Sequence, residues 1–223
     1  MQRTRLSAGG YPVSIFTPES CGKCPVVYIH ITDEEAQAVA ELQGEAKFVL
    51  VALDGVDWND DLSPWPASKA FRGGNDFSGG ADAYLKKLTE DIVPAVEKNL
   101  AFTPHSRAIA GYSLAGLFAI YALYRTDIFS RAASVSGSLW YDGFLDFLEQ
   151  SSPIRMPEKV YFSLGDRESK IKNPRFALVD KCTVREYNIM QSLGANTLFE
   201  WNSGNHYADV PERIAKGLRW IST

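Results

Sequence analysis

Short apolar runs alternate with longer segments of helical periodicity along most of this chain. Runs such as PVVYIHI at 25–31 and KFVLVALD at 47–54 are apolar at almost every position, so both faces of these strands should be buried. The predicted strands are 2–7, 11–17, 25–31, 47–54, 106–112, 131–136, 158–164 and 197–202. The predicted helices are 33–43, 80–100, 114–125, 175–194 and 209–221. The pattern predicts an α/β fold in which a mostly parallel sheet of about eight strands, opened by an antiparallel hairpin, carries helices on both faces.

The length of the chain and the absence of an obvious linker favour one domain. With 223 residues, of which 45% are hydrophobic, the chain can bury a sizeable core. We therefore expect a single domain over 1–223 without a separate cap domain. One long segment, 55–79, has no periodicity, and loops of that length in a folded domain are usually functional or mobile.

Charge and hydropathy exclude several classes of partner. The net charge of −4 gives no basic surface for nucleic acid or for an anionic membrane. The N-terminus lacks the apolar stretch of a signal peptide, and no apolar run approaches the roughly 18 residues of a membrane span. We expect a cytoplasmic protein that binds a small molecule, and the sequence makes no prediction of its oligomeric state.

Three cysteines are too few for a disulfide framework. Cys21 and Cys24 form a C-x-x-C pair that could be redox-active, half a zinc site or two loop thiols. A zinc site needs four ligands, and a redox pair should open a helix, whereas a strand follows here. We interpret them as two loop thiols and expect no metal and no cofactor.

The stretch GYSLAGL at 111–117 lies where a predicted strand meets a predicted helix. The glycines could be ordinary turn residues. Alternatively, G-x-S-x-G in this context is a nucleophile elbow, a strained turn that lifts the Ser113 hydroxyl above the carboxyl edge of the sheet. The start of the helix would then direct the backbone N–H of Leu114 toward a developing oxyanion. This context favours the catalytic interpretation.

A serine nucleophile needs a base, and the chain has only three histidines. His105 precedes its strand and should lie at the opposite edge of the sheet. His30 ends a strand at the correct edge but comes before the serine. The order serine, acid, histidine of this hydrolase plan selects His206, which follows the last predicted strand, although a surface histidine is the alternative there.

The acid should follow the strand KVYFSLG, where the turn GDRESK carries Asp166 and Glu168. Either carboxylate could orient an imidazole, and spacing alone does not separate them. A second oxyanion donor should come from the HIT segment at 30–32, for which we name the backbone N–H of Ile31.

Several stretches together resemble a known family. GYSLAGL, SVSGSLWYDG at 134–143, SLGDRES at 163–169 and GNHYADV at 204–210 resemble the putative-esterase family of α/β-hydrolases, and in particular its siderophore (enterobactin-type trilactone) esterases. The segment 71–100, with its Arg, Asp-aromatic and Gly-Gly-Ala-Asp elements, agrees with that branch. The resemblance covers about 47–210 and implies an α/β-hydrolase fold.

Carried to this chain, the resemblance implies Ser113 as nucleophile, His206 as base and Glu168, three residues after Gly165, as the favoured acid. It also implies that Arg72 binds substrate, since a guanidinium suits carboxylate or catecholate oxygens. The chain departs from this branch at His30-Ile31, where Asp-Gly is usual. Aromatic residues that could form the wall of a pocket, or simply pack the long loop, are Trp58, Trp65, Phe77 and Trp140.

The sequence thus predicts a serine ester hydrolase with a Ser–acid–His triad acting on carboxylic esters, a siderophore-like trilactone among the candidate substrates. A thioesterase or small-acyl esterase would use the same residues. A non-catalytic binding protein of hydrolase fold is the alternative from another class, and the altered HIT segment is the feature that favours it.

Overall fold

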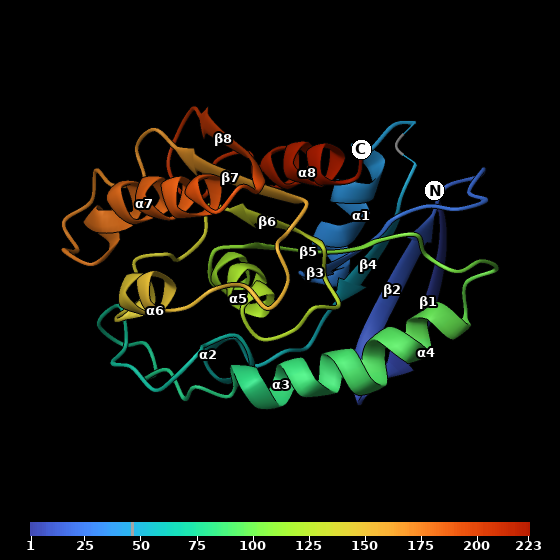
Figure 1. The fold of residues 1–223 in the computed structure, drawn as a ribbon, viewed down its shortest axis with the longest axis horizontal. Coiled ribbons are helices and arrows are strands. Elements are labelled where there is room, and N and C mark those ends of the chain that lie inside the picture. The colour runs from blue at the N-terminus through green and yellow to red at the C-terminus, as the bar shows by residue number, and fades with distance from the viewer. Residues whose placement is uncertain (46) are drawn as a thin grey trace.

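An eight-stranded mixed sheet runs through the protein in a computed structural model that describes residues 1–45 and 47–223 (Figure 1). The strand order is β1-β2-β4-β3-β5-β6-β7-β8. The strands are β1 Gln2–Ala8, β2 Tyr11–Thr17, β3 Val26–His30, β4 Val49–Leu53, β5 Arg107–Tyr112, β6 Arg131–Val135, β7 Lys159–Gly165 and β8 Asn196–Asn202. Each predicted strand is present, with ends that differ from the prediction by no more than two residues.

Pairing follows the burial of the strands. β3 and β4 are buried at every residue and pair in parallel, as do all later neighbours from β3 to β8. β1 and β2 are antiparallel and are joined by Gly9 and Gly10, both at positive φ, which is the geometry that a two-residue hairpin requires. The predicted mostly parallel sheet with an antiparallel start is confirmed.

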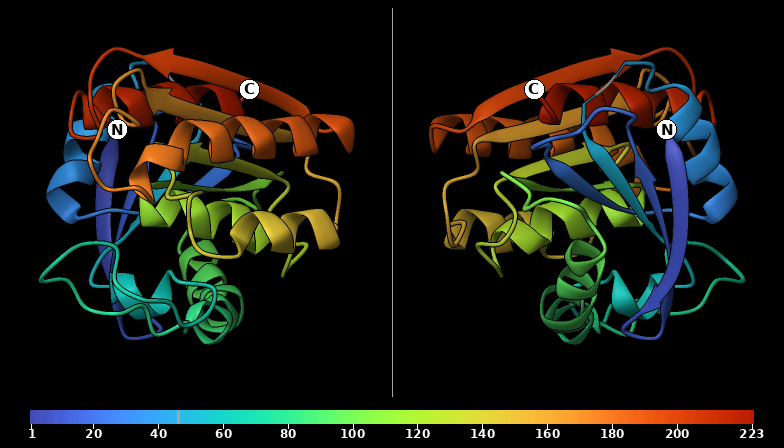
Figure 2. Two further views of the ribbon diagram at one scale, coloured as in Figure 1. Left: turned by 90° about the vertical axis from the view of Figure 1, so that its left-hand side faces the viewer. Right: turned by 90° about the vertical axis from the view of Figure 1, so that its right-hand side faces the viewer.

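Helices cover both faces of the sheet, as predicted (Figures 1 and 2). α1 and α8 pack together on one face, while α3, α4, α5 and α7 enclose a larger core on the other. The α-helices are α1 Asp33–Glu41, α2 Trp58–Asp61, α3 Ala81–Lys87, α4 Val93–Lys98, α5 Leu114–Leu123, α6 Phe144–Gln150, α7 Val179–Ser192 and α8 Val210–Ile221. α5 is buried at every residue, because it lies between the sheet and the surrounding helices.

Two short helices were not predicted. α6 spans only seven residues, too few for apolar spacing to distinguish it from a loop. α2 lies inside 55–79 and begins where Asp57 caps the N–H groups of Asn59 and Asp60, so the prediction of an entirely irregular loop is wrong there. The predicted helix 80–100 consists of α3, a π-helical turn at Leu88–Ile92 and α4, since Pro94 cannot donate the regular helical hydrogen bond.

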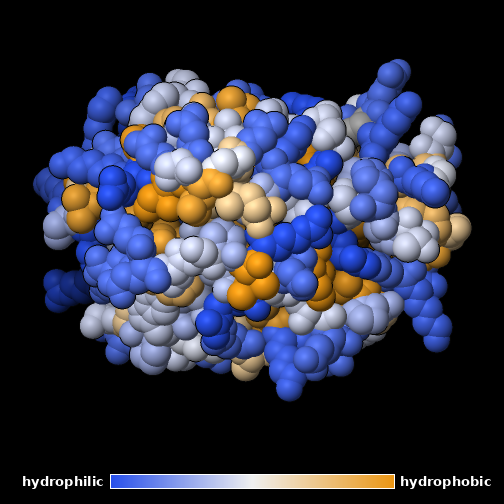
Figure 3. Space-filling view, viewed as in Figure 1, coloured by the Kyte–Doolittle hydropathy of each residue, from blue (hydrophilic) through white to orange (hydrophobic). Residues whose placement is uncertain are grey.

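Cys21 and Cys24 are joined as a disulfide in the loop between β2 and β3, so the interpretation as two separate thiols is wrong. Cys182, on α7, is a buried free thiol. Figure 3 shows a largely hydrophilic face on which hydrophobic side chains gather in separate groups, one near α7 and others at the centre and right of the view. Within the two described ranges, none of the helices has both the length and the apolar character of a membrane span.

Candidate active site

Ser113 occupies a strained turn between β5 and α5. Its φ of 56° and ψ of −122° are unusual for a residue with a side chain, and such strain is most often found at functional sites. Two backbone hydrogen bonds hold the turn: Ser113 donates to Val135, at 3.1 Å, and accepts from Ser138, at 2.9 Å. A Cβ at Gly111 would collide with the backbone carbonyl group of Ala115. Gly111 is therefore needed for the close approach of β5 and α5 at this turn, which agrees with a nucleophile elbow rather than with an ordinary turn.

His206 lies directly above this turn. Its Nε2 is 3.1 Å from the Ser113 Oγ, and its Nδ1 is 2.7 Å from the Glu168 Oε2. A carboxylate can only accept, so Nδ1 carries the proton and Nε2 is free to accept from the serine hydroxyl. The three side chains that the sequence selects as nucleophile, base and favoured acid are thus brought together in one line.

Asp166 does not take part in this line. It is exposed, and its Oδ1 accepts from the backbone N–H of Gly204 at 2.8 Å. That hydrogen bond ties the turn after β7 to the loop that carries His206. Asp166 therefore shapes the loop, while Glu168 contacts the imidazole itself.

Glu168 is held in a buried hydrogen-bond network with only 3% of its side chain exposed. Its Oε1 accepts from the Gly165 N–H at 2.6 Å, the Ser136 hydroxyl at 2.7 Å and the Arg213 Nη1 at 3.1 Å. Burial acts to raise the pKa of this carboxyl, but the hydrogen bonds from His206, Gly165 and Ser136 outweigh burial and hold the pKa below its usual value. Glu168 is therefore ionised at neutral pH.

Arg213, on α8, is a member of this network that the sequence interpretation missed. Its side chain is 1% exposed, and besides Glu168 it reaches the Ser203 carbonyl oxygen at 2.8 Å. The Tyr112 hydroxyl lies 3.4 Å from the Arg213 Nη1 and donates to the His206 carbonyl oxygen at 2.6 Å. The sequence does contain a signal for this role. Arg213 is a charged residue among the buried positions of α8, whose apolar face is formed by Ile214, Leu218 and Ile221.

The other predicted groups at this edge of the sheet have different surroundings. Leu114 is the first residue of α5, so its N–H has no intrahelical acceptor and lies beside Ser113. The Ile31 side chain is buried in the core, and the oxyanion role of its N–H stays a prediction. His30 is fully buried, bonds to the Tyr84 hydroxyl at 2.9 Å and has a pKa lowered by burial to about 3. His105 is exposed, as expected.

Ser113 and His206 open into a cavity of about 300 Å³. Trp58, Phe77 and Trp140 line it, which agrees with the predicted aromatic wall. Trp65 instead packs against Phe144 and Phe147 and donates from its indole to the Asp142 carbonyl oxygen. Arg72 is exposed and lies outside the set of lining residues, so its role in substrate binding stays a prediction. The lining residues that the sequence analysis did not select are Asn59, Ala70, Phe71, Asn75, Ser136, Ser138, Ile171, Phe176, Val179 and Tyr207.

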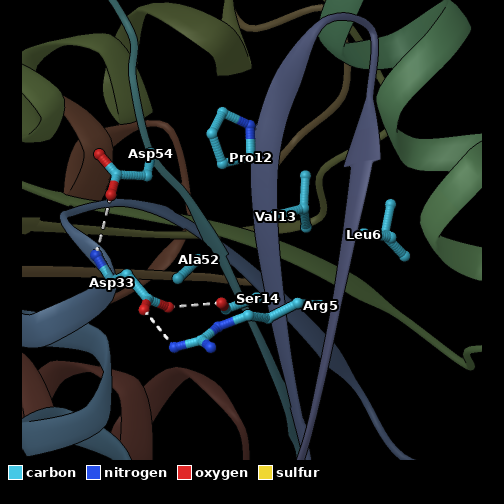
Figure 4. Close-up of a pocket in the computed structure, with 8 residues that line it drawn as sticks. All are labelled: Arg5, Leu6, Pro12, Val13, Ser14, Asp33, Ala52 and Asp54. Carbon is cyan, nitrogen blue, oxygen red and sulfur yellow. Dashed lines mark hydrogen bonds and ion pairs between the residues drawn. The ribbon is translucent and has the colours of Figure 1, made fainter.

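A second, smaller cavity of about 160 Å³ lies beside the β1–β2 hairpin (Figure 4). Its charged groups bind one another. Asp33 accepts from Arg5 and Ser14, and its backbone N–H donates to Asp54. The described residues that line it include no histidine or cysteine, so the cavity at Ser113 and His206 is the better candidate for catalysis.

The sequence profile of the putative-esterase family matches residues 9–216. The chain belongs to the putative-esterase family. The predicted resemblance is thereby confirmed, and membership supports an esterase, and hence a hydrolase, function.

Family relatives extend over most of the chain. An uncharacterised protein, YbbA of Bacillus subtilis (strain 168), is 29% identical over 96% of this chain and 93% of its own length. The ferri-bacillibactin esterase BesA of the same organism is 22% identical over 91% of this chain and 69% of its own.

Solved structures share the fold. An IroE-like serine hydrolase from Shewanella oneidensis superposes with a TM-score of 0.80 at 20% identity, covering 99% of this chain and 79% of that one. The siderophore hydrolase EstB from Aspergillus nidulans gives a TM-score of 0.73 at 18% identity, covering 99% and 94%. At these identities the likeness establishes the fold, which is the predicted α/β-hydrolase fold.

Proposed function

We propose that this esterase is a serine ester hydrolase that uses Ser113, His206 and Glu168 as a catalytic triad. The observation that carries the proposal is the line of hydrogen bonds from the Ser113 hydroxyl through His206 to Glu168, which opens into a cavity. Family membership supports the ester as substrate. The buried, ionised Glu168 supports the role of an acid that stabilises a protonated imidazole.

In the proposed reaction the Ser113 Oγ attacks the ester carbonyl carbon while His206 Nε2 takes the hydroxyl proton. The tetrahedral oxyanion accepts a hydrogen bond from the Leu114 N–H, with the Ile31 N–H proposed as second donor. His206 then returns the proton to the departing alkoxide, which leaves an acyl group on Ser113. Water, deprotonated by His206, attacks this acyl-enzyme, and His206 returns the proton to the departing Ser113 Oγ as the acid is released.

We also propose candidate classes of ester substrate. The names of BesA and EstB make siderophore esters candidates, and thioesters or small-acyl esters would meet the same catalytic groups. Arg72 is proposed to bind an anionic part of the substrate outside the cavity, since it is exposed.

Labelling with a fluorophosphonate tests the mechanism and the non-catalytic alternative together. The wild-type protein should be labelled on Ser113 and should hydrolyse p-nitrophenyl esters, and Ser113→Ala should lose both properties while it keeps its melting temperature. Loss of a triad nucleophile lowers kcat by about 10⁶-fold in a well-studied serine protease. Labelling that persists in pure Ser113→Ala protein would rule out this nucleophile, and an unlabelled wild type would favour a binding protein.

The two carboxylates provide a matched pair for the proposed acid. Glu168→Gln should lower kcat by about 10²–10⁴-fold, because a neutral amide neither stabilises the imidazolium nor fixes the tautomer. Asp166→Asn should lower kcat only a few-fold, since Asp166 bonds to the loop and not to the ring. The opposite ranking would assign the acid role to Asp166, and two small effects would leave a Ser–His dyad.

A further inference from the structure

The inner surface of the active-site cavity is dominated by aromatic rings. These rings are Trp58, Phe71, Phe77, Trp140, Phe176 and Tyr207. Trp140 and Phe176 meet edge to face with their centroids 4.6 Å apart, the arrangement into which a further ring packs well. Ala70, Leu114, Ile171 and Val179 add further apolar surface, and Asn59, Asn75, Ser136 and Ser138 add polar groups that carry no charge.

The cavity contains no fixed positive charge. Of the described residues that line it, none is a lysine or an arginine, and the ionisable groups are Glu168, His206 and the Tyr207 hydroxyl. Glu168 is negative and already bonded to His206. A carboxylate or a deprotonated catechol in this space would therefore lose its hydration without gaining a counter-charge.

The cations around the cavity do not change this conclusion. Arg175, beside Phe176, is paired with Asp142 at 3.0 Å, and its guanidinium lies 5.2 Å from the centre of the Trp140 ring. Arg72 adjoins the lining residue Phe71 in the chain, and Lys170 and Lys172 flank the lining residue Ile171, but all three cations are exposed and none lines the cavity. These side chains keep their charges in water or in an ion pair.

The volume limits the size of the substrate. At about 300 Å³, the cavity is at the lower end of the range of ligand pockets, which is roughly 300–1,000 Å³. It can hold one ring with a short linker to the ester, whereas a trilactone with three catechol arms would have to leave most of its bulk outside.

We infer that the preferred substrate is a carboxylic ester that carries a single uncharged aromatic ring, bound against the contacting pair Trp140 and Phe176 and against Phe77, with its carbonyl at Ser113. This inference deepens the proposed function and rests on it for the position of the carbonyl. The ring preference follows from the walls of the cavity and is separate from the chemistry at Ser113.

Four esters test the preference by kcat/KM. They are methyl phenylpropanoate, its cyclohexyl analogue, its para-carboxyphenyl analogue and a ferric catecholate trilactone. The phenyl ester should exceed the cyclohexyl ester by about 2- to 10-fold, the contribution of aromatic packing. It should exceed the carboxyphenyl ester by at least about tenfold, because a buried unpaired charge is costly. A carboxyphenyl, cyclohexyl or trilactone ester hydrolysed as well as the phenyl ester would overturn the inference.

Binding to Ser113→Ala, measured by calorimetry with the phenyl and carboxyphenyl methyl esters, separates this inference from the mechanism. The phenyl ester should again bind at least about tenfold more tightly. If the wild type is not labelled by fluorophosphonate, the proposed function fails, but this binding ratio still decides the ring preference. Equal binding of the two esters overturns the preference even when Ser113 is the nucleophile.

Two variants locate the ring. Trp140→Leu and Phe176→Leu should each reduce the phenyl-over-cyclohexyl ratio toward one, since each removes an aromatic wall that the ring is inferred to contact. Trp201→Leu is the matched control, because Trp201 is 54% exposed on β8 and does not line this cavity. A ratio that stays at its wild-type value in both wall variants would contradict the placement of the ring.

Discussion

At the scale of single residues, Arg213 connects the proposed acid to the helix behind it. Its guanidinium reaches the Glu168 carboxylate and the Ser203 carbonyl oxygen, and a neighbouring hydroxyl, that of Tyr112, holds the backbone of His206. Glu168 and His206 are thus positioned by a cation that touches neither Ser113 nor the cavity. Removing one partner of a buried ion pair is strongly destabilising, because the other charge is left without compensation.

Arg213→Met should therefore destabilise the protein by about 3–5 kcal/mol, since it leaves Glu168 buried and uncompensated. The pKa of Glu168 should rise, so the acid limb of kcat/KM should move to higher pH. Arg213→Lys keeps the charge and should restore part of both properties. Thermal denaturation measures the stability, and a pH–rate profile measures the acid limb of kcat/KM. If Arg213→Met is destabilised but its acid limb stays at the wild-type pH, the role of Arg213 is purely structural.

At the scale of elements, the turn between β5 and α5 depends on close approach of the backbone. The added Cβ of Gly111→Ala would meet the Ala115 carbonyl group, so the turn would have to open. We expect a loss of stability of about 1–3 kcal/mol and much slower fluorophosphonate labelling. Gly22→Ala is the control, because a Cβ there meets no atom within 4 Å. Normal labelling of a stable Gly111→Ala protein would show that the turn tolerates relaxation.

α7 buries a carboxyl that has no partner among the residues described. Both oxygens of Glu186 lack a hydrogen bond, and so does the neighbouring Tyr124 hydroxyl at the end of α5. Burial raises the pKa of Glu186 well above its ordinary value of 4.5. Glu186 is therefore protonated in the folded protein at pH values where the unfolded chain has already released that proton.

This difference makes the stability depend on pH. The favourable contribution is complete below the unfolded pKa and is lost as pH rises through the folded pKa. Glu186→Gln imitates the protonated acid, so its melting temperature should exceed that of the wild type by an amount that grows from about pH 4.5 upward. A difference in melting temperature that stays constant between about pH 4 and pH 8 would show that Glu186 does not titrate in this range.

At the scale of the whole molecule, segments far apart in the chain meet around the cavity. Asn173 donates to the Ala70 carbonyl oxygen at 2.6 Å, and Arg175 donates to those of Ser68 and Lys69 at 2.8 and 3.0 Å. Through its ion pair with Asp142, Arg175 also reaches the segment that follows β6. Arg175 thus joins three loops that carry lining residues.

Arg175→Ala should lower kcat/KM about tenfold, mainly through KM, because several charge-assisted hydrogen bonds to the loops are lost. Fluorophosphonate labelling should change little. Limited proteolysis should cut more rapidly at 66–75. Arg185→Ala is the matched control, since its pair with Glu149 joins α6 and α7 on the surface. Equal effects of the two variants would contradict a specific role for Arg175.

The sheet and the proposed triad were predictable because both depend on local patterns. Strands buried on both faces are apolar throughout, and the glycines around Ser113 mark a turn that few other residues permit. The position of Glu168 rather than Asp166 beside His206 was favoured only by resemblance. It depends on a turn whose shape is set by Asp166 and Gly204.

What the sequence could not predict depends on contacts between distant segments. The partners of the buried Arg213 guanidinium and the packing of Trp65 away from the cavity each require the tertiary structure. α6 was missed because seven residues are too few for a clear period. Phe71 and Ile171 were not predicted to line the cavity, because they lie in segments without periodicity.

The order of the proposed catalytic residues along the chain has a consequence for folding during synthesis. Ser113 lies near the middle, whereas Glu168, His206 and Arg213 follow in the later part, after β7, after β8 and on α8. Ser113 leaves the ribosome before the other three residues, and a domain generally folds as a unit. Ser113 in the growing chain would therefore lack its base until β8 and α8 have packed. Hydrolysis would begin only after the sheet is complete.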